Sequence, residues 1–253
     1  GDINPLFTAS GSGGSNFNWY DISGNTLSTN TITFTSLEIN PGTYTYLVEE
    51  VVGSCTSLQT NFTFTIHTPP AAPSVLPSTI MICEGGVPSD FVANTNNPVA
   101  GTFNWYDDIT LTNQIGTGVT FTPTQTVAGT YTYWITETDV ITACISTTSS
   151  VTFTIHDLPL IPMVSVAPSA VICDGDNNPT FTASQTLGSV GTNDFTWYDD
   201  VTLTNQVGTG TTFIPTQTSV GIYTFWLTET NSSSLPMCEG GALAFTFEII
   251  SLP

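Results

Sequence analysis

The sequence contains no Lys or Arg among its 253 residues, whereas Asp and Glu together number 20. A typical globular chain is about 25% charged, with roughly half of those residues basic, so chance does not explain this absence. A chain without cationic side chains cannot neutralise phosphates, which argues against nucleic acids and anionic membrane surfaces as partners. The Lys that phosphate-binding loops and Schiff-base chemistry require is also missing.

Long apolar runs, helical periodicity and clustered metal ligands are absent as well. No run approaches the roughly 18 apolar residues needed to span a bilayer, so membrane insertion is not expected. No segment sustains a period of 3.6 residues, and no Cys-x-x-Cys pair or His cluster suggests a zinc site. Hydrophobic residues nevertheless make up 40% of the chain. This ordinary apolar content predicts a folded protein with buried cores.

One pattern occurs three times along the chain, and such internal repetition determines the domain organisation. The tripeptide Trp-Tyr-Asp begins at Trp19, Trp105 and Trp197, and a Gly-x-Tyr-Thr-aromatic element begins at Gly42, Gly129 and Gly221. These landmarks recur every 86–94 residues or so, and residues 103–138 align with residues 195–230 at 26 of 36 identical positions. We therefore expect three repeats, at residues 1–68, 69–157 and 158–253.

Each repeat has the alternation of β-strands. In the segment that begins at Gly129, Tyr131, Tyr133 and Ile135 fall on one face with a period of two. A unit of about 90 residues with some seven short strands is typical of an immunoglobulin-like sandwich. Proline-rich segments at residues 67–78 and 156–169 predict semi-stiff linkers. The expected fold is all-β: tandem immunoglobulin-like β-sandwiches in an elongated rod.

Two hallmarks of that sandwich identify candidate core residues. A buried Trp on the third strand and a tyrosine corner near the sixth strand are typical of immunoglobulin-like domains. The corresponding core residues are Trp19, Trp105, Trp197, Tyr44, Tyr131 and Tyr223.

The order of short motifs resembles a known group of repeats. Ile-Cys-acid-Gly, Phe-x-Trp-Tyr-Asp, Gly-Thr-Gly, Gly-Thr-Tyr-Thr-Tyr, Thr-Glu-Thr, Cys and Val-Thr-Phe-Thr-Ile follow one another in the second repeat. This order resembles the Ig-like repeats of large secreted Bacteroidota cell-surface proteins, adhesins associated with gliding motility and type 9 secretion. The resemblance covers nearly the whole chain. It implies an extracellular, cell-surface location and a role in a stalk, adhesin or filament.

Five cysteines occupy two kinds of position in the repeats. Cys83 and Cys173 precede the second strand, whereas Cys55, Cys144 and Cys238 follow the sixth. Equivalent positions in one repeat predict the disulfides Cys83–Cys144 and Cys173–Cys238, with Cys55 unpaired or joined to another segment. Buried free thiols are the alternative, which the expected secretion of the chain disfavours.

The repeats offer no residue set for catalysis. His67 and His156 are equivalent, but repeat 3 has Ile250 at that position, which favours a structural role. Because repeats 2 and 3 are nearly the same, neither holds unique residues for a single active site. We expect a protein that is not an enzyme.

Two acidic pairs are weak candidates for Ca²⁺ ligands. Asp107, Asp108, Asp199 and Asp200 follow the Trp-Tyr pairs, with Asn113 and Asn205 nearby. Oxygen-rich sites suit Ca²⁺, but the spacing of known Ca²⁺ loops is absent. A solvated turn is the favoured interpretation, and no other metal or cofactor is expected.

Trp134 and Trp226 alternate with the core residues, so they form a possible contact surface for surface glycans or for lateral packing. The favoured function is a non-enzymatic extracellular structural or adhesive repeat segment of a surface stalk, adhesin or filament. The alternative is a set of carbohydrate-binding accessory repeats of a secreted polysaccharide-degrading protein.

The start of the sequence corresponds to the middle of a repeat. Residues 1–10 align with residues 175–184, so we expect repeat 1 to lack its first strand and first Cys. A sandwich without an edge strand exposes unpaired backbone groups. We expect the strand, and a partner for Cys55, to come from the same polypeptide continued upstream or from a neighbouring subunit. The expected partners are adjacent copies or segments of the same protein, arranged head-to-tail.

Overall fold

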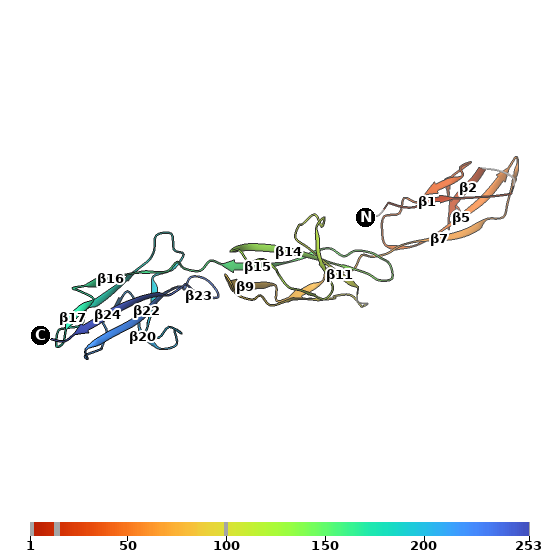
Figure 1. Ribbon diagram of the computed structural model, residues 1–253. Helices are drawn as coiled ribbons and strands as arrows, with labels where there is room; N and C mark the ends of the chain where they lie inside the picture. The colour runs from red at the N-terminus through yellow and green to blue at the C-terminus, as the bar shows by residue number, and fades with distance from the viewer. Residues whose placement is uncertain (1–2, 13–15, 99–100, 253) are drawn as a thin grey trace. The chain divides into compact units, whose positions relative to one another are not determined.

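The computed structural model describes residues 3–12, 16–98 and 101–252 (Figure 1). All regular structure in these residues is β-strand, and none of them forms a helix long and apolar enough to cross a membrane. The chain divides into two compact units. One unit contains Gly1–Ala71 and Thr138–Thr147, and the other contains Ala72–Glu137 and Thr148–Pro253.

Repeat 2 consists of two sheets that face one another across one core. The larger sheet has the order β12 (Gln114–Thr117), β11 (Thr102–Tyr106), β14 (Gly129–Thr138), β15 (Ser149–His156) and β9 (Thr79–Cys83). The smaller sheet has the order β13 (Thr120–Phe121), β10 (Phe91–Asn94) and β8 (Ser74–Leu76). Buried residues from both sheets form one cluster, which includes Phe91, Trp105, Tyr133 and Phe153. Repeat 2 is therefore a β-sandwich.

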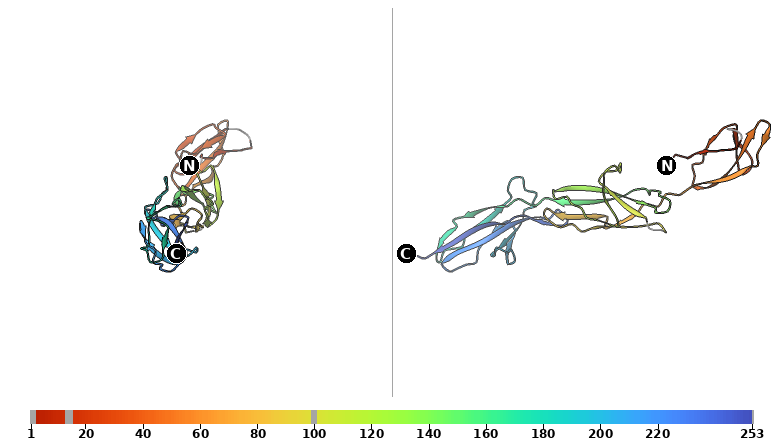
Figure 2. Two further views of the ribbon diagram at one scale, coloured as in Figure 1. Left: turned by 60° about the vertical axis from the view of Figure 1, so that its left-hand side comes forward. Right: turned by 45° about the vertical axis from the view of Figure 1, so that its right-hand side comes forward.

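Repeat 3 has the same arrangement of two sheets, and Figure 2 gives two further views of its strands, coloured from teal to blue. Its larger sheet has the order β17 (Val171–Cys173), β24 (Leu243–Ile250), β22 (Gly221–Asn231), β19 (Asp194–Tyr198) and β20 (Gln206–Thr209), and β23 (Cys238–Glu239) pairs with β22. Its smaller sheet has the order β16 (Met163–Ala167), β18 (Thr180–Ser184) and β21 (Thr212–Phe213). The fold is all-β with tandem immunoglobulin-like sandwiches.

The first strand of repeats 2 and 3 is shared between the two sheets. In repeat 2, β8 pairs with β10 of the smaller sheet, and β9 then pairs in parallel with β15 of the larger sheet. In repeat 3, β16 and β17 do the same with β18 and β24. The cis peptide bonds Leu76–Pro77 and Ala167–Pro168 lie between the two halves.

Repeat 1 has fewer strands. Its larger sheet contains β3 (Thr26–Ser28), β2 (Asn16–Asp21), β5 (Gly42–Val52), β6 (Cys55–Thr56) and β7 (Thr60–Ile66), and its smaller sheet pairs β1 (Leu6–Thr8) with β4 (Thr33–Thr35). Within the described residues, nothing in repeat 1 corresponds to the split first strand. Among the residues that the structure describes, β7 has a neighbour only on the side of β5, whereas β15 and β24 each also have a parallel neighbour.

The Trp of each Trp-Tyr-Asp motif is buried, namely Trp19, Trp105 and Trp197. Their indole N–H groups donate to the backbone carbonyls of Thr31, Gly118 and Gly210, respectively. The Tyr residues predicted for the core differ: Tyr44, Tyr131 and Tyr223 are half-buried. Their hydroxyl groups donate to the carbonyls of Asn40, Val127 and Ser219, each four residues earlier. This is the hydrogen bond of a tyrosine corner, and it holds the phenol at the edge of the core.

Candidate functional site

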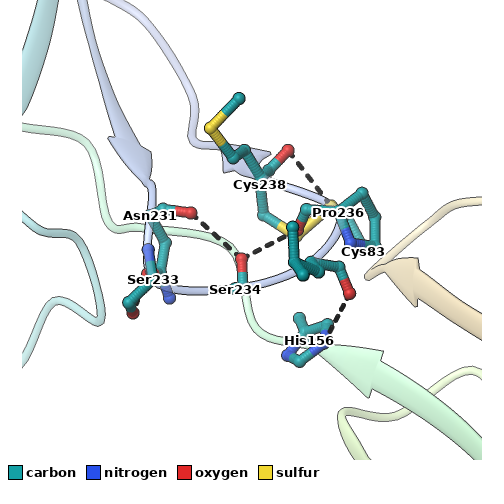
Figure 3. Close-up of a disulfide and its surroundings, with 9 residues drawn as sticks. Cys83, His156, Asn231, Ser233, Ser234, Pro236 and Cys238 are labelled. Atoms are coloured by element: carbon teal, nitrogen blue, oxygen red, sulfur yellow. Dashed lines mark hydrogen bonds between the residues drawn. A yellow bond between two sulfur atoms is a disulfide. The ribbon is translucent and has the colours of Figure 1, made fainter.

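The most distinctive covalent feature is a disulfide between two repeats. Cys83 at the end of β9 bonds to Cys238 at the start of β23, with their Cα atoms 5.6 Å apart and a sequence separation of 155 (Figure 3). The predicted pairings within repeats are therefore wrong. Cys144 and Cys173 are half-buried free thiols, and Cys55 is an exposed free thiol.

Strand direction explains why Cys83 does not pair with Cys144. Because β9 runs parallel to β15, Cys83 lies opposite His156, the last residue of β15. β14 runs antiparallel to β15, so its final residues lie beside the start of β15, where Ile135 pairs with Ser149. Cys144 follows β14, so the two cysteines of repeat 2 lie at opposite ends of the larger sheet. No rearrangement of side chains could join them.

The loop that carries Cys238 contacts the end of repeat 2. Nε2 of His156 lies 3.1 Å from the carbonyl oxygen of Leu235 and donates to it. Within the loop, the hydroxyl of the buried Ser234 donates to the carbonyls of Asn231 and Pro236, at 3.0 and 2.8 Å. These bonds shape the turn that presents Cys238 (Figure 3).

A linker residue completes this junction. A Cβ atom on Gly240 would collide with the backbone of Pro159, so only glycine allows this approach. Pro159 is buried although it lies in a linker. The disulfide, the His156 hydrogen bond and this contact together join repeats 2 and 3.

The cysteines that follow the long strands occupy one structural position. Cys55 pairs across the strands with Val52, and Cys238 pairs with Asn231. Asp139 is the residue of repeat 2 that corresponds to Val52 and Asn231, and its N–H donates to the carbonyl of Cys144 at 2.9 Å. Loops of different lengths thus bring Cys55, Cys144 and Cys238 to equivalent places.

The two first-strand cysteines are equivalent in the same sense. Cys83 lies opposite His156, and Cys173 lies opposite Ile250 at the end of the last strand of repeat 3. In the strand pairing of repeat 3, Cys173 therefore occupies the position that Cys83 occupies in repeat 2.

His67 repeats the position of His156 at the end of repeat 1. The 138–147 loop, which follows β14, belongs to the same compact unit as repeat 1. The pKa of Asp139 in this loop is held below its ordinary value, mainly by the backbone N–H groups of Thr142 and Ile141, and the ring of His67 adds to the effect.

The acidic pairs form capped turns. The carboxylate of Asp108 accepts hydrogen bonds from the Thr110 hydroxyl and from the N–H groups of Thr112 and Asn113, and these bonds lower the pKa of Asp108 to about 2. Asp107 accepts from the side-chain amide of Asn113. Asp199 and Asp200 form the same set of bonds with Asn205, Thr202 and Thr204. Hydrogen-bond donors from the same turn thus satisfy these carboxylates, and the role of the carboxylates is to stabilise the turn.

The described part of the chain holds no cluster of metal ligands. Among residues 3–12, 16–98 and 101–252, no group of three or more His, Cys, Asp and Glu side chains could hold a metal ion. Trp134 and Trp226 are each half-buried on the outer face of the larger sheet, where Trp226 pairs with Tyr198.

Two carboxyl groups, one in repeat 2 and one in repeat 3, are buried, which the sequence did not predict. Glu137 and Glu229, the Glu of each Thr-Glu-Thr motif, are 1% and 0% exposed. Glu137 accepts from the side chain of Asn97 at 2.6 Å and from the N–H of Gly101 at 2.8 Å. The recurring Thr-Glu-Thr motif marked these positions, but nothing in the motif indicated that the carboxyls are buried. Each carboxyl instead organises the loop that precedes the Trp strand.

Comparison with known proteins agrees with the repeat structure for the second repeat. Residues 70–156 match the family described as Ig-like domain, CHU_C associated. The search of curated proteins gave no match.

Two solved structures have low similarity scores. The fibronectin(III)-like modules of Clostridium thermocellum CbhA match with a TM-score of 0.39 and 10% identity, covering 71% of this chain and 94% of that chain. Murine CEACAM1b matches with a TM-score of 0.30 and 15% identity, covering 71% of this chain and 99% of that chain. Scores this low carry no argument about function. Over residues 70–156 the second repeat is thus similar to the Ig-like domains of the CHU_C-associated family.

Proposed function

We propose that this chain is a non-enzymatic structural segment of an extracellular stalk, adhesin or filament, in which neighbouring segments follow one another head-to-tail. Tandem immunoglobulin-like modules support this role, because repeats 2 and 3 are each a sandwich with its own core. A disulfide supports an oxidising, extracellular location, since such bonds persist there and are rare in the cytosol.

The single observation that carries the proposal is the bond between Cys83 and Cys238. Tension applied to the two ends of the chain enters repeat 2 near Cys83 and leaves repeat 3 after Cys238. With the bond intact, the 155-residue span between these cysteines cannot be extended. Most of repeat 2 and most of repeat 3 are therefore shielded from force, which suits a load-bearing stalk.

The shielded length is large enough to measure. A fully extended chain spans at most about 3.5 Å per residue, so the closed segment hides on the order of 540 Å of extension. Disulfides within each repeat, Cys83–Cys144 and Cys173–Cys238, would together hide about 440 Å. They would leave the junction between the repeats to carry the load alone.

Single-molecule stretching of the oxidised chain tests this proposal. The oxidised protein should extend by about 540 Å less than the Cys83→Ser variant when both are pulled to full length by their ends. The Cys55→Ser variant is the matched control and should behave as the parent protein, because Cys55 is a free thiol. Equal extension of the parent and Cys83→Ser chains would refute a load-bearing role for this bond.

A further inference from the structure

We propose that repeat 1 contains a strand-acceptor site: the open edge of β7 binds a parallel strand that ends in Ile-Cys-acid, and Cys144 forms a disulfide with the cysteine of that strand. The occupant is an extended segment with the sequence character of residues 162–174. This inference rests on the proposed function, because the strand is expected to come from a neighbouring segment of the same kind.

The first observation is the open edge itself. In repeats 2 and 3 the strand equivalent to β7 has a parallel neighbour, β9 beside β15 and β17 beside β24. β7 pairs with β5 on one side only within the described residues. An unpaired edge of this kind readily accepts a further strand by main-chain hydrogen bonding.

The second observation is incomplete burial beside that edge. Phe153 and Ile155 of β15 are 0% and 3% exposed, whereas their counterparts Phe64 and Ile66 on β7 are half-buried. In repeat 2 the first strand covers this region with Ile80, which is itself buried. Repeat 1 therefore has an apolar surface that a strand carrying Ile at the matching position would cover.

The smaller sheet shows the same deficit. Phe7 and Ala9 are half-buried in repeat 1, whereas Phe91 and Ala93 at the same positions of repeat 2 are 0% and 2% exposed. Val75 of β8 is the neighbouring buried residue in repeat 2. One segment that crosses from the smaller to the larger sheet, as residues 74–83 do, would cover both surfaces.

The register of the added strand follows from the other two repeats. The first-strand cysteine lies opposite His156 in repeat 2 and opposite Ile250 in repeat 3. The acidic residue after it donates its N–H to that same partner, at 2.9 and 2.8 Å. In repeat 1 the equivalent partner is His67, so the incoming cysteine lies opposite His67.

The third observation identifies the covalent partner. Cys144 occupies the position of Cys238, and its thiol is free and half-buried. Its loop belongs to the same compact unit as β7. The carbonyl of Cys144 accepts the N–H of Asp139 at 2.9 Å, which corresponds to the pairing of Cys238 with Asn231 in repeat 3. By this equivalence, we place Cys144 beside the edge of β7 as Cys238 lies beside β9.

The bond forms by oxidation of two thiols. The thiol of Cys144 and the thiol of the incoming strand each give up one proton and one electron, and a sulfur–sulfur bond forms. A protein or small-molecule disulfide accepts the two electrons and two protons and is reduced to two thiols. An incoming cysteine already held as a mixed disulfide needs no oxidant, because the Cys144 thiolate displaces its leaving thiolate.

A peptide with the sequence of residues 162–174 tests the site in the intact chain. Its cysteine is supplied as a mixed disulfide with 5-thio-2-nitrobenzoate, and the labelled cysteine is identified by peptide mass mapping. We expect attachment at Cys144 at least ten times as fast as at Cys55. Exposure alone gives the opposite order, because Cys55 is exposed and Cys144 is half-buried.

Two altered peptides serve as matched controls. Ile172 is 8% exposed and Val171 is 46% exposed in their own strand. A peptide with Ile172→Asp should lose the preference for Cys144 at least tenfold, whereas a peptide with Val171→Asp should keep it.

Amide hydrogen exchange provides a readout that does not involve the thiol. The N–H of Thr152 in β15 donates to the carbonyl of Ser78, which precedes β9, at 3.1 Å, and the counterpart of Thr152 on β7 is Thr63. Exchange at the Thr63 amide should slow at least tenfold when the peptide is bound. Labelling that favours Cys55, or unchanged exchange at β7, overturns the proposal. Neither result affects the stretching experiment, which depends on Cys83 and Cys238 alone.

Discussion

Gly191 lies directly against the carboxyl group of Glu229, so close that a Cβ atom at this position would overlap it. The Glu229 side chain is fully buried. It accepts hydrogen bonds from the hydroxyl of Ser189 at 3.0 Å and from the N–H of Asn193 at 3.1 Å. The carboxyl therefore cannot move away from position 191 without losing its partners. In repeat 1, Gly11 stands in the same relation to Glu50.

This contact predicts that the Gly191→Ala substitution destabilises repeat 3. Overpacking of a filled site typically costs about 1–3 kcal/mol, and we expect a loss in the free energy of unfolding within that range. Urea unfolding followed by Trp fluorescence measures it. The neighbouring Val190→Ala variant is the control, because Val190 is exposed and its change should stay within about 0.5 kcal/mol. Equal stability of the two variants would contradict the prediction.

The tyrosine corner predicts a smaller effect in repeat 2. In the Tyr131→Phe variant the hydroxyl that donates to the carbonyl of Val127 at 2.8 Å is lost. The net value of such a hydrogen bond is about 1 kcal/mol, and we expect the free energy of unfolding to fall by that amount. The Tyr223→Phe variant should lose as much in repeat 3, because its bond to Ser219 is the same. An unchanged urea midpoint in both variants would show that the corner does not stabilise the fold.

Much of the fold could be predicted because it depends on local pattern. The alternation around Tyr133 and Ile135 places both side chains in the core, and it follows from the two-residue period of strands. The Trp-Tyr-Asp landmarks fixed the Trp strand of each repeat, and Trp105 and Trp197 are fully buried. Such features need no knowledge of how distant strands pair.

The disulfide could not be predicted because it depends on a long-range strand pairing. Repetition shows that Cys83 and Cys173 are equivalent, but it does not show at which end of the sheet they lie. Only the parallel pairing of β9 with β15 places Cys83 beside repeat 3. The buried Glu229 was missed for a related reason. Its hydrogen-bond donors come from a loop about 40 residues earlier in the chain.

The absence of Lys and Arg allows the connectivity of the disulfide to be tested directly. An Asp157→Arg substitution introduces the single trypsin site of the chain, in the exposed linker between repeats 2 and 3. After cleavage, the two fragments should migrate together without reductant and separate with reductant, because Cys83 and Cys238 lie on opposite sides of the cut. The same chain with Cys83→Ser is the control and should separate in both cases. Separation of the parent fragments without reductant would instead indicate disulfides within each repeat.

The capped turns and the overall negative charge predict a stability that first rises and then falls as the pH is lowered. Twenty acidic residues with no Lys or Arg repel one another at neutral pH, and partial protonation toward pH 5 relieves that repulsion. The pKa of Asp108 is lowered to about 2 by the Thr110 hydroxyl and the Asn113 N–H, and the pKa of Asp200 is lowered in the same way. A carboxyl whose folded pKa is depressed stabilises the fold above its unfolded pKa of about 4 and loses that effect as the pH falls through the folded value.

The melting temperature, followed by circular dichroism, should therefore increase from pH 7 to pH 5 and decrease from about pH 4 toward pH 2. Added salt should reduce the increase, because it screens the repulsion between exposed carboxylates. A chain with Asp108→Asn and Asp200→Asn should show a smaller decrease at low pH, since neither position can then be protonated. A melting temperature that falls steadily from pH 7 to pH 5 would contradict the charge argument. A large increase with Ca²⁺ and none with Mg²⁺ would instead identify the acidic turns as ion sites, because the flexible geometry of Ca²⁺ suits such loops better than the strict octahedron of Mg²⁺.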